Sequence, residues 1–271
     1  MFREGGDGLE ATLNGCRIYY ELQRCDRPGA PNVLFLHGWG CDSSMFSFLT
    51  SGFMPDATVA AIDFPGHGKS DEPPAPWGVA EFAEQVRAFI LQNHLEPVHL
   101  IAHSFGGRIA LWLASHYPEL IARLVLTGGA GLKKPVSDRS RRRTARFKRY
   151  NALLEKAKAG PLTALAEGWQ AKLRAHYGSP DYVKLNENMR KTFVKIVSED
   201  LFPLLDQVRA STLLIWGDKD TETPLWMAET MAEHIADSAV IVFEGGTHFA
   251  FLEQWQRFLL ITRQFILEEQ G

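Results

Sequence analysis

The chain has 271 residues, of which 45% are hydrophobic and 23% are charged, and its formal net charge at pH 7 is -3. This composition is ordinary for a globular protein, and the length fits one α/β domain with an insertion. The small negative charge argues against a nucleic acid as partner. The cysteines are odd in number and lack the paired spacing of metal ligands, so they predict no disulfide framework: Cys16, Cys25 and Cys41.

The N-terminal residues 1–6 are polar and rich in glycine, and they lack the apolar run that a signal peptide needs. Elsewhere in the sequence no apolar run is long enough to cross a bilayer. We therefore expect a cytoplasmic protein without a membrane span.

Short apolar runs rich in β-branched residues alternate along the chain with stretches of helical periodicity, such as 79–90 and 109–113. The strand-like runs are 33–36, 59–62, 98–102, 124–127, 213–216 and 240–243. This alternation predicts an α/β fold with a mainly parallel sheet flanked by helices. Each run ends at glycine, serine or an acidic residue, and in such sheets ligands bind at the carboxyl ends of the strands.

A single serine, Ser104, lies where the strand-like run 98–102 ends and a helix-like run begins. Its neighbours two positions away, Ala102 and Gly106, are small, as a sharp turn requires if it is not to clash with the adjacent strand or helix. Such a turn exposes the serine hydroxyl and places the Phe105 N–H at a helix N-terminus, where it can stabilise negative charge. The segment therefore predicts a nucleophilic serine.

The alternation breaks between residues 131 and 207, where no strand-like run occurs and Arg, Lys, Ala, Leu and Glu prevail. Glycine and proline divide this region into expected helices at about 137–159, 162–176 and 181–198. We expect residues 1–130 and 208–271 to form the core domain and residues 131–207 to form a helical lid that shapes the pocket.

The first expected lid helix carries a basic run over residues 139–149. Such a run can bind an anionic substrate, an acidic lipid surface or RNA. The simpler interpretation is the solvated face of a lid helix, because the chain as a whole is negatively charged.

A nucleophilic serine needs a base, and the base needs an acid to hold its tautomer. His248 follows the last strand-like run, in the glycine-containing loop 244–249, where a side chain can reach the serine. His103 directly precedes the serine and is expected to point elsewhere, because adjacent side chains diverge. Asp218 and Asp220 both follow the run 213–216, and each is either the acid or a solvated turn carboxylate.

On these residues the chain resembles the α/β-hydrolase fold proteins over nearly all of its length. Members of that family order their residues as serine, acid and histidine, and their acid ends a Gly-x-x-Asp turn. The resemblance implies that Ser104 is the nucleophile, that Asp220 rather than Asp218 is the acid, and that His248 is the base. Ala102 stands where the family's Gly-x-Ser-x-Gly pattern has glycine, which is a mild departure because alanine still fits a tight turn.

The loop 37–40 resembles the family's oxyanion loop, which implies that the N–H of Trp39 joins the N–H of Phe105 as the second oxyanion donor. The segment 63–70 resembles a turn of the same family, and we interpret it as structural. An apolar pocket for the substrate is expected from Trp39, Phe105, Trp169, Trp226 and Phe249. No histidine or carboxylate cluster has metal-ligand spacing, so we expect no metal and no other cofactor.

These residues predict a serine hydrolase that cleaves small-molecule carboxylic esters with small or medium acyl groups through an acyl-enzyme on Ser104. Alternatives with the same three residues are a hydrolase of carbon–carbon bonds in vinylogous diketones, a lactonase, and an acyltransferase or perhydrolase. Outside enzymes, the alternative is a ligand-binding receptor that keeps the triad.

Overall fold

The computed structural model describes residues 8–134, 138–157 and 185–268, together with positions 163, 165, 167–170, 172 and 182. The chain divides into two compact units. The first unit comprises Met1–Leu132 and Lys195–Gly271, and the second comprises Lys133–Val194.

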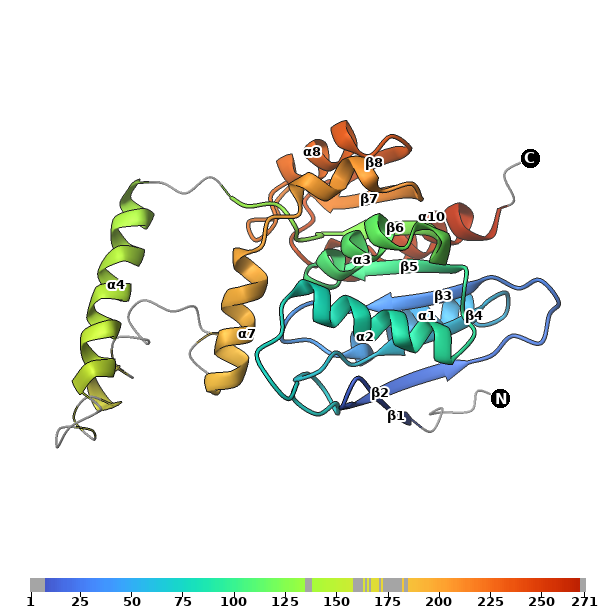
Figure 1. Ribbon diagram of the computed structural model, residues 1–271. Helices are drawn as coiled ribbons and strands as arrows, with labels where there is room; N and C mark the ends of the chain where they lie inside the picture. The colour runs from blue at the N-terminus through green and yellow to red at the C-terminus, as the bar shows by residue number, and fades with distance from the viewer. Residues whose placement is uncertain are drawn as a thin grey trace. The chain divides into compact units, whose positions relative to one another are not determined.

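The first unit is built on one eight-stranded sheet with the strand order β1-β2-β4-β3-β5-β6-β7-β8 (Figure 1). The strands are β1 Leu9–Leu13, β2 Cys16–Gln23, β3 Asn32–Leu36, β4 Thr58–Ile62, β5 Val98–His103, β6 Ile121–Thr127, β7 Ser211–Gly217 and β8 Ser238–Phe243. Strands β3 to β8 are parallel to one another, whereas β2 runs antiparallel to both β1 and β4. The expected α/β fold is therefore confirmed.

The six expected strand-like runs lie within β3 to β8. Strands β3 to β7 are largely buried, whereas the edge strand β8 is mostly partly buried. The antiparallel pair β1 and β2 was not predicted. These two strands flank Asn14 and Gly15, which have φ values of 49° and 75°. An Asn-Gly pair of this conformation is a strong hairpin signal, and it was available in the sequence.

Helices cover both faces of the sheet. One apolar cluster packs α2 (Val79–Gln92), α3 (Phe105–His116) and α8 (Trp226–His234) against the sheet, and the other packs α1 (Ser47–Phe53), α9 (Ala250–Glu253) and α10 (Trp255–Leu267). Three short 3-10 helices complete the unit: η1 Ser43–Phe46, η2 Pro118–Leu120 and η3 Phe202–Gln207. Because all the parallel strands end at the same edge, the loops after β5, β7 and β8 can share one site.

Residues 195–207 belong to the first unit, although the sequence analysis assigned them to the lid. Their apolar side chains Ile196, Leu201 and Leu205 are buried in the core cluster beside α3. Hydrogen bonds strengthen this attachment: the Arg108 guanidinium donates to the Glu199 carbonyl at 2.9 Å, and the Leu201 N–H donates to the Gly131 carbonyl at 2.9 Å.

The second unit contains α4 (Asp138–Ala157) and most of α7 (Glu187–Ser198). Asn186 caps the N-terminus of α7, because its Oδ1 accepts a hydrogen bond from the Met189 N–H at 2.9 Å. Asparagine is one of the residues preferred at this position. The helix expected at about 162–176 lies mostly outside the described residues. Three arginines of the basic run lie on α4 and are exposed: Arg142, Arg146 and Arg149. Among the helices of the described residues, none is long and apolar enough to span a membrane.

Candidate active site

Ser104 sits at the junction of β5 and α3 with φ 49° and ψ -109°. A positive φ is strained for a residue that carries a side chain, and such strain persists only where the surroundings enforce it. Serine at this N-cap position usually accepts a hydrogen bond from the helix, but the side chain of Ser104 makes no capping hydrogen bond. The turn therefore leaves the hydroxyl to other partners.

The small residues around Ser104 are required by close backbone contacts. Ala102 is fully buried and pairs in register with Leu36 on one side and Leu126 on the other. A methyl group on Gly106 would lie 2.3 Å from the carbonyl oxygen of Leu36, which is far inside van der Waals contact. The Gly106 N–H donates to the His37 carbonyl at 3.0 Å, which ties the start of α3 to the loop after β3.

Asp220 lies in the loop after β7, and its carboxylate is fully buried. Four donors reach this carboxylate at 2.8 Å each: the backbone N–H groups of Glu222 and Thr223, the Thr223 hydroxyl and His248 Nδ1. Burial by itself would raise the pKa of Asp220, but the hydrogen bonds from His248 and Thr223 outweigh it and hold the pKa below its usual value. Asp220 is therefore an ionised, fixed acceptor.

Asp218, the rival candidate from the sequence, lies outside this network. Its side chain is exposed, and its carboxylate pairs with Lys219 at 3.3 Å. Asp218 thus has the environment of a solvated turn residue.

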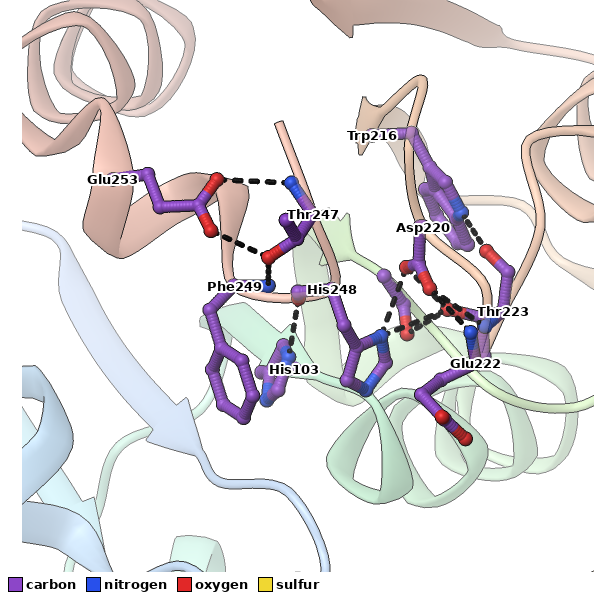
Figure 2. A network of polar contacts seen from close by, with 10 residues as sticks. His103, Trp216, Asp220, Glu222, Thr223, Thr247, His248, Phe249 and Glu253 are labelled. Atoms are coloured by element: carbon purple, nitrogen blue, oxygen red, sulfur yellow. Dashed lines mark hydrogen bonds and ion pairs between the residues drawn. The ribbon is translucent and has the colours of Figure 1, made fainter. Parts of the chain in front are cut away.

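His248 lies in the loop after β8, and hydrogen bonds fix this loop on both sides. Glu253 accepts hydrogen bonds from the N–H and the hydroxyl of Thr247, as Figure 2 shows. On the other side the Lys219 N–H donates to the Gly246 carbonyl at 2.9 Å. This approach is possible because Gly217 has no side chain, since a methyl group there would lie 2.2 Å from the Gly246 oxygen.

The structure brings the Asp220 and His248 side chains together, with Nδ1 2.8 Å from Oδ2 (Figure 2). Because an ionised carboxylate only accepts, Nδ1 carries the proton and Nε2 is left with a lone pair. The His248 side chain keeps 14% of its surface exposed, whereas that of Asp220 has none. The lone pair of His248 Nε2 therefore belongs to a partly exposed ring, whose Nδ1 is hydrogen-bonded to the buried charge of Asp220.

One chain segment, residues 127–130, connects this pair to Ser104. The Ser104 N–H donates to the Thr127 carbonyl at 3.2 Å, and the Ala130 N–H donates to the Ser104 carbonyl at 2.9 Å. A methyl group on Gly128 would lie 3.1 Å from His248 Nδ1 and 3.2 Å from Asp220 Oδ2. The three candidate residues thus surround a single short stretch of backbone.

The loop expected to hold the oxyanion is shaped by His37, which is fully buried. Its Nε2 accepts from the Phe64 N–H at 2.9 Å, so its Nδ1 carries the proton and donates to the Gly38 carbonyl at 2.7 Å. Burial lowers the pKa of His37 to about 3, and nearby His67 adds to the effect. This bond fixes the Gly38–Trp39 peptide, and with it the direction of the Trp39 N–H.

The aromatic residues expected to form a pocket fall into several groups. The rings of Trp39 and Phe105 are in edge contact, with centroids 5.4 Å apart. The Phe249 ring lies 5.5 Å from the His248 ring and is 39% exposed. Trp226 is half-buried against the core cluster. Trp169 belongs to the second unit and is exposed, so its place in a pocket stays a prediction.

Two residues of this network were missed by the sequence analysis. His103 does not point away from the site, because its Nε2 lies 3.0 Å from the His248 carbonyl and its ring lies 4.7 Å from the His248 ring. Thr223 contacts both Asp220 and His248. Position directly before Ser104 was a signal for His103, whereas Thr223 follows Asp220 in an ordinary turn sequence. Among the described residues, no group of three His, Cys, Asp or Glu side chains is placed to hold a metal ion.

Residues 31–254 match the family model of the alpha/beta hydrolase fold. The chain belongs to this family. The expected resemblance is thereby confirmed.

Similar sequences include named hydrolases. The chain is 28% identical to a pimeloyl-[acyl-carrier protein] methyl ester esterase of Neisseria meningitidis, over 91% of this chain and 98% of that esterase. It is 27% identical to the monoacylglycerol lipase ABHD6 of Bos taurus, over 84% of this chain and 73% of the lipase. A hydrolase from Pseudomonas aeruginosa has a similar fold, with a TM-score of 0.74, 22% identity, and coverage of 97% of this chain and 99% of that one.

Proposed function

We propose that the chain is a serine hydrolase of small-molecule carboxylic esters with small or medium acyl groups. In this proposal Ser104 is the nucleophile, His248 is the base and Asp220 is the acid. The backbone N–H groups of Trp39 and Phe105 hold the oxyanion. Two similar proteins, an esterase and a lipase, are named for ester substrates, which is consistent with this class.

The reaction follows from the roles of these groups. His248 Nε2 takes the Ser104 proton while Oγ attacks the ester carbonyl, and the carbonyl electrons move onto the oxyanion. As the tetrahedral intermediate collapses, the proton passes from His248 to the leaving alcohol, and the acyl group stays on Ser104. Water then attacks the acyl-enzyme, with His248 again taking and returning the proton. Each oxyanion donor contributes about 100- to 1,000-fold to such a reaction.

The observation that carries the proposal is the 2.8 Å hydrogen bond between His248 Nδ1 and Asp220 Oδ2, beside the segment 127–130 that also binds the Ser104 backbone. A buried, ionised carboxylate that fixes the tautomer of a partly exposed imidazole is the arrangement of a general base. The side chain of Ser104 makes no capping hydrogen bond to α3, so its hydroxyl is not tied to the helix, which supports its role as the nucleophile.

We also propose that the second unit, Lys133–Val194, acts as a lid that selects the acyl group, with Trp39, Phe105, Trp226 and Phe249 as aromatic residues of the core that line the pocket. The chain enters the second unit at Lys133, three residues after the segment 127–130, which supports this role. A loop or lid in that position can exclude water once a substrate is bound.

Ser104→Ala tests the proposal. This change removes the nucleophile, and we expect kcat for a p-nitrophenyl ester to fall on the order of 10⁶-fold, to the background rate. The thermal unfolding midpoint and the circular dichroism spectrum should stay those of a folded protein. Ser115→Ala, which changes another serine on α3, is the matched control and should keep full activity. Retained activity in Ser104→Ala would overturn the assignment.

Two further measurements separate the alternatives. A fluorophosphonate labels an activated serine covalently, so labelling of Ser104 excludes an inert receptor, and absence of labelling supports one. Relative rates on esters graded by acyl length, on lactones and on a vinylogous diketone then assign the chemistry. A strong preference for the diketone would contradict ester hydrolysis as the main reaction.

A further inference from the structure

The hydroxyl of Thr223 has no role in the mechanism above, yet it lies at the centre of the polar network in Figure 2. Thr223 is only 5% exposed. Its Oγ1 lies 2.8 Å from Asp220 Oδ2, 3.2 Å from His248 Nδ1 and 2.9 Å from the Gly128 carbonyl oxygen. A single hydroxyl therefore contacts the acid loop, the base loop and the segment that adjoins Ser104.

The backbone of Thr223 is held in place from two directions. Its N–H donates to Asp220 Oδ1 at 2.8 Å, and its carbonyl accepts from Nε1 of the fully buried Trp216 at 2.6 Å. A β-branched side chain on a fixed backbone has few rotamers. The position of the hydroxyl is thus set by the fold around it.

The protons of the network can be assigned from its donors and acceptors. Nδ1–H of His248 donates to Asp220 Oδ2 at 2.8 Å, and Thr223 Oγ1 offers a lone pair to the same N–H from 3.2 Å. The one hydroxyl proton then goes to Asp220 Oδ2 or to the Gly128 carbonyl, which lie at nearly equal distances. In both cases the hydroxyl favours the tautomer in which Nδ1 is protonated and Nε2 is basic.

We propose that Thr223 is a positioning residue for catalysis, whose hydroxyl holds the Asp220 carboxylate and the His248 ring in the orientation and tautomer that leave the lone pair on Nε2. This inference rests on the proposed function, because its effect on rate is transmitted through His248. Without the hydroxyl, the His248 N–H loses its second acceptor, and either the facing carboxylate oxygen or the Gly128 carbonyl loses a donor.

Two substitutions test the inference. Thr223→Val keeps the shape and removes the hydroxyl, whereas Thr223→Ser keeps the hydroxyl and removes a methyl group. Orienting partners of this kind contribute about 10- to 100-fold to activity in other sites. We expect Thr223→Val to lower kcat for a p-nitrophenyl ester by such a factor with KM unchanged, and Thr223→Ser to restore most of the rate.

The pH profile provides a readout that a purely structural role would not move. The hydroxyl is a hydrogen-bond partner of the Asp220–His248 pair, so its loss should shift the acidic limb of kcat/KM in Thr223→Val and not in Thr223→Ser. If Thr223→Val fails to fold by circular dichroism, Thr223→Ala is measured in its place with the same expectation.

A measurement without substrate separates this inference from the proposed function. The Nδ1–H of a histidine bonded to a carboxylate gives a low-field proton NMR signal, which we expect to shift or broaden in Thr223→Val and to persist in Thr223→Ser. If wild-type protein cleaves no ester but the signal responds in this way, the proposed function fails and the positioning role stands. Unchanged kcat, pH profile and NMR signal in Thr223→Val would overturn the inference.

Discussion

The buried histidines near Ser104 act through hydrogen bonds to the backbone. His37 donates from Nδ1 to the Gly38 carbonyl and thereby orients the peptide that carries the Trp39 N–H. His103 donates from Nε2 to the His248 carbonyl, and its Nδ1 has no hydrogen-bond partner in the described part of the chain. Burial, together with a smaller effect of a neighbouring histidine, lowers the pKa of each to about 3. Both rings are therefore neutral at physiological pH and serve as single donors.

His103→Phe tests the contact between β5 and the loop that carries His248. Phenylalanine fills a similar volume but leaves the His248 carbonyl without its donor, which costs about 1–3 kcal/mol of stability. We expect a lower free energy of unfolding in urea and slower fluorophosphonate labelling of Ser104, because the base loop is less well held.

His99→Phe is the matched control. His99 lies near the start of the same strand, and its buried Nδ1 makes no hydrogen bond with the described residues, so this change breaks no bond at that atom. Labelling should proceed at the wild-type rate in His99→Phe. Equal labelling rates in the two variants would show that the His103 contact does not position the base.

At the scale of elements, the junction of β5 and α3 depends on a close approach between α3 and the end of β3. Gly106→Ala tests it, because the new methyl group would lie 2.3 Å from the Leu36 carbonyl oxygen, and backbone atoms move little. We expect a loss of several kcal/mol in the free energy of unfolding, on the order of the larger effects of single substitutions, and loss of ester hydrolysis.

The control for Gly106→Ala is Gly168→Ala. Gly168 has helical backbone and is exposed, and no atom of the described residues lies within 4 Å of the added methyl group. Alanine in a helix is more favourable than glycine by about 1 kcal/mol, so this variant should be at least as stable as wild type. Measured by urea unfolding, similar destabilisation in both variants would contradict the packing argument.

Elements differ in how well the sequence predicts them. The buried parallel strands are apolar on both faces, so 33–36 and 98–102 are recognisable as continuous runs. The antiparallel strands β1 and β2 mix polar and apolar residues, and 8 of their 13 residues are partly buried or exposed, so only the Asn14–Gly15 turn identifies them. Strands of mixed polarity rely on pairing with neighbours, which a local pattern does not contain.

The same distinction applies to the candidate site. Asp220 and His248 can be predicted as candidate site residues from the sequence, because each follows an apolar run that ends at the same edge of the sheet. Thr223 cannot be predicted in this way, because its contacts join three loops that meet only in the folded chain. The choice between Asp218 and Asp220 likewise depended on the family's turn pattern, since the two residues are alike in local sequence.

At the scale of the whole molecule, the neutral buried histidines make stability depend on pH. An unfolded histidine has a pKa near 6.5, whereas His37 and His103 have folded values of about 3, so the unfolded chain binds more protons between these limits. Stability therefore falls as pH drops below 6.5. From pH 7.5 to 5.5 each residue removes about 1.4 kcal/mol, or roughly 3 kcal/mol together.

Urea unfolding at pH 7.5 and pH 5.5 measures this difference. Burial also lowers the pKa of His99, to about 4, so His99→Phe should reduce the difference by about 1 kcal/mol. The pKa of Asp220 is below its usual value too, and its contribution is lost only at more acidic pH. Equal or greater stability at pH 5.5 would contradict the assignment of these rings as buried and neutral.

Strands β6 and β7 are neighbours in the sheet although the second unit lies between them in the chain. The hydrogen bond from the Leu201 N–H to the Gly131 carbonyl joins the points where the chain leaves and re-enters the core. This bond joins the two ends of the insertion within the core, so the pairing of β6 and β7 does not depend on contacts made by Lys133–Val194. We therefore expect that residues of this stretch can be changed in length or sequence while the strands keep their register.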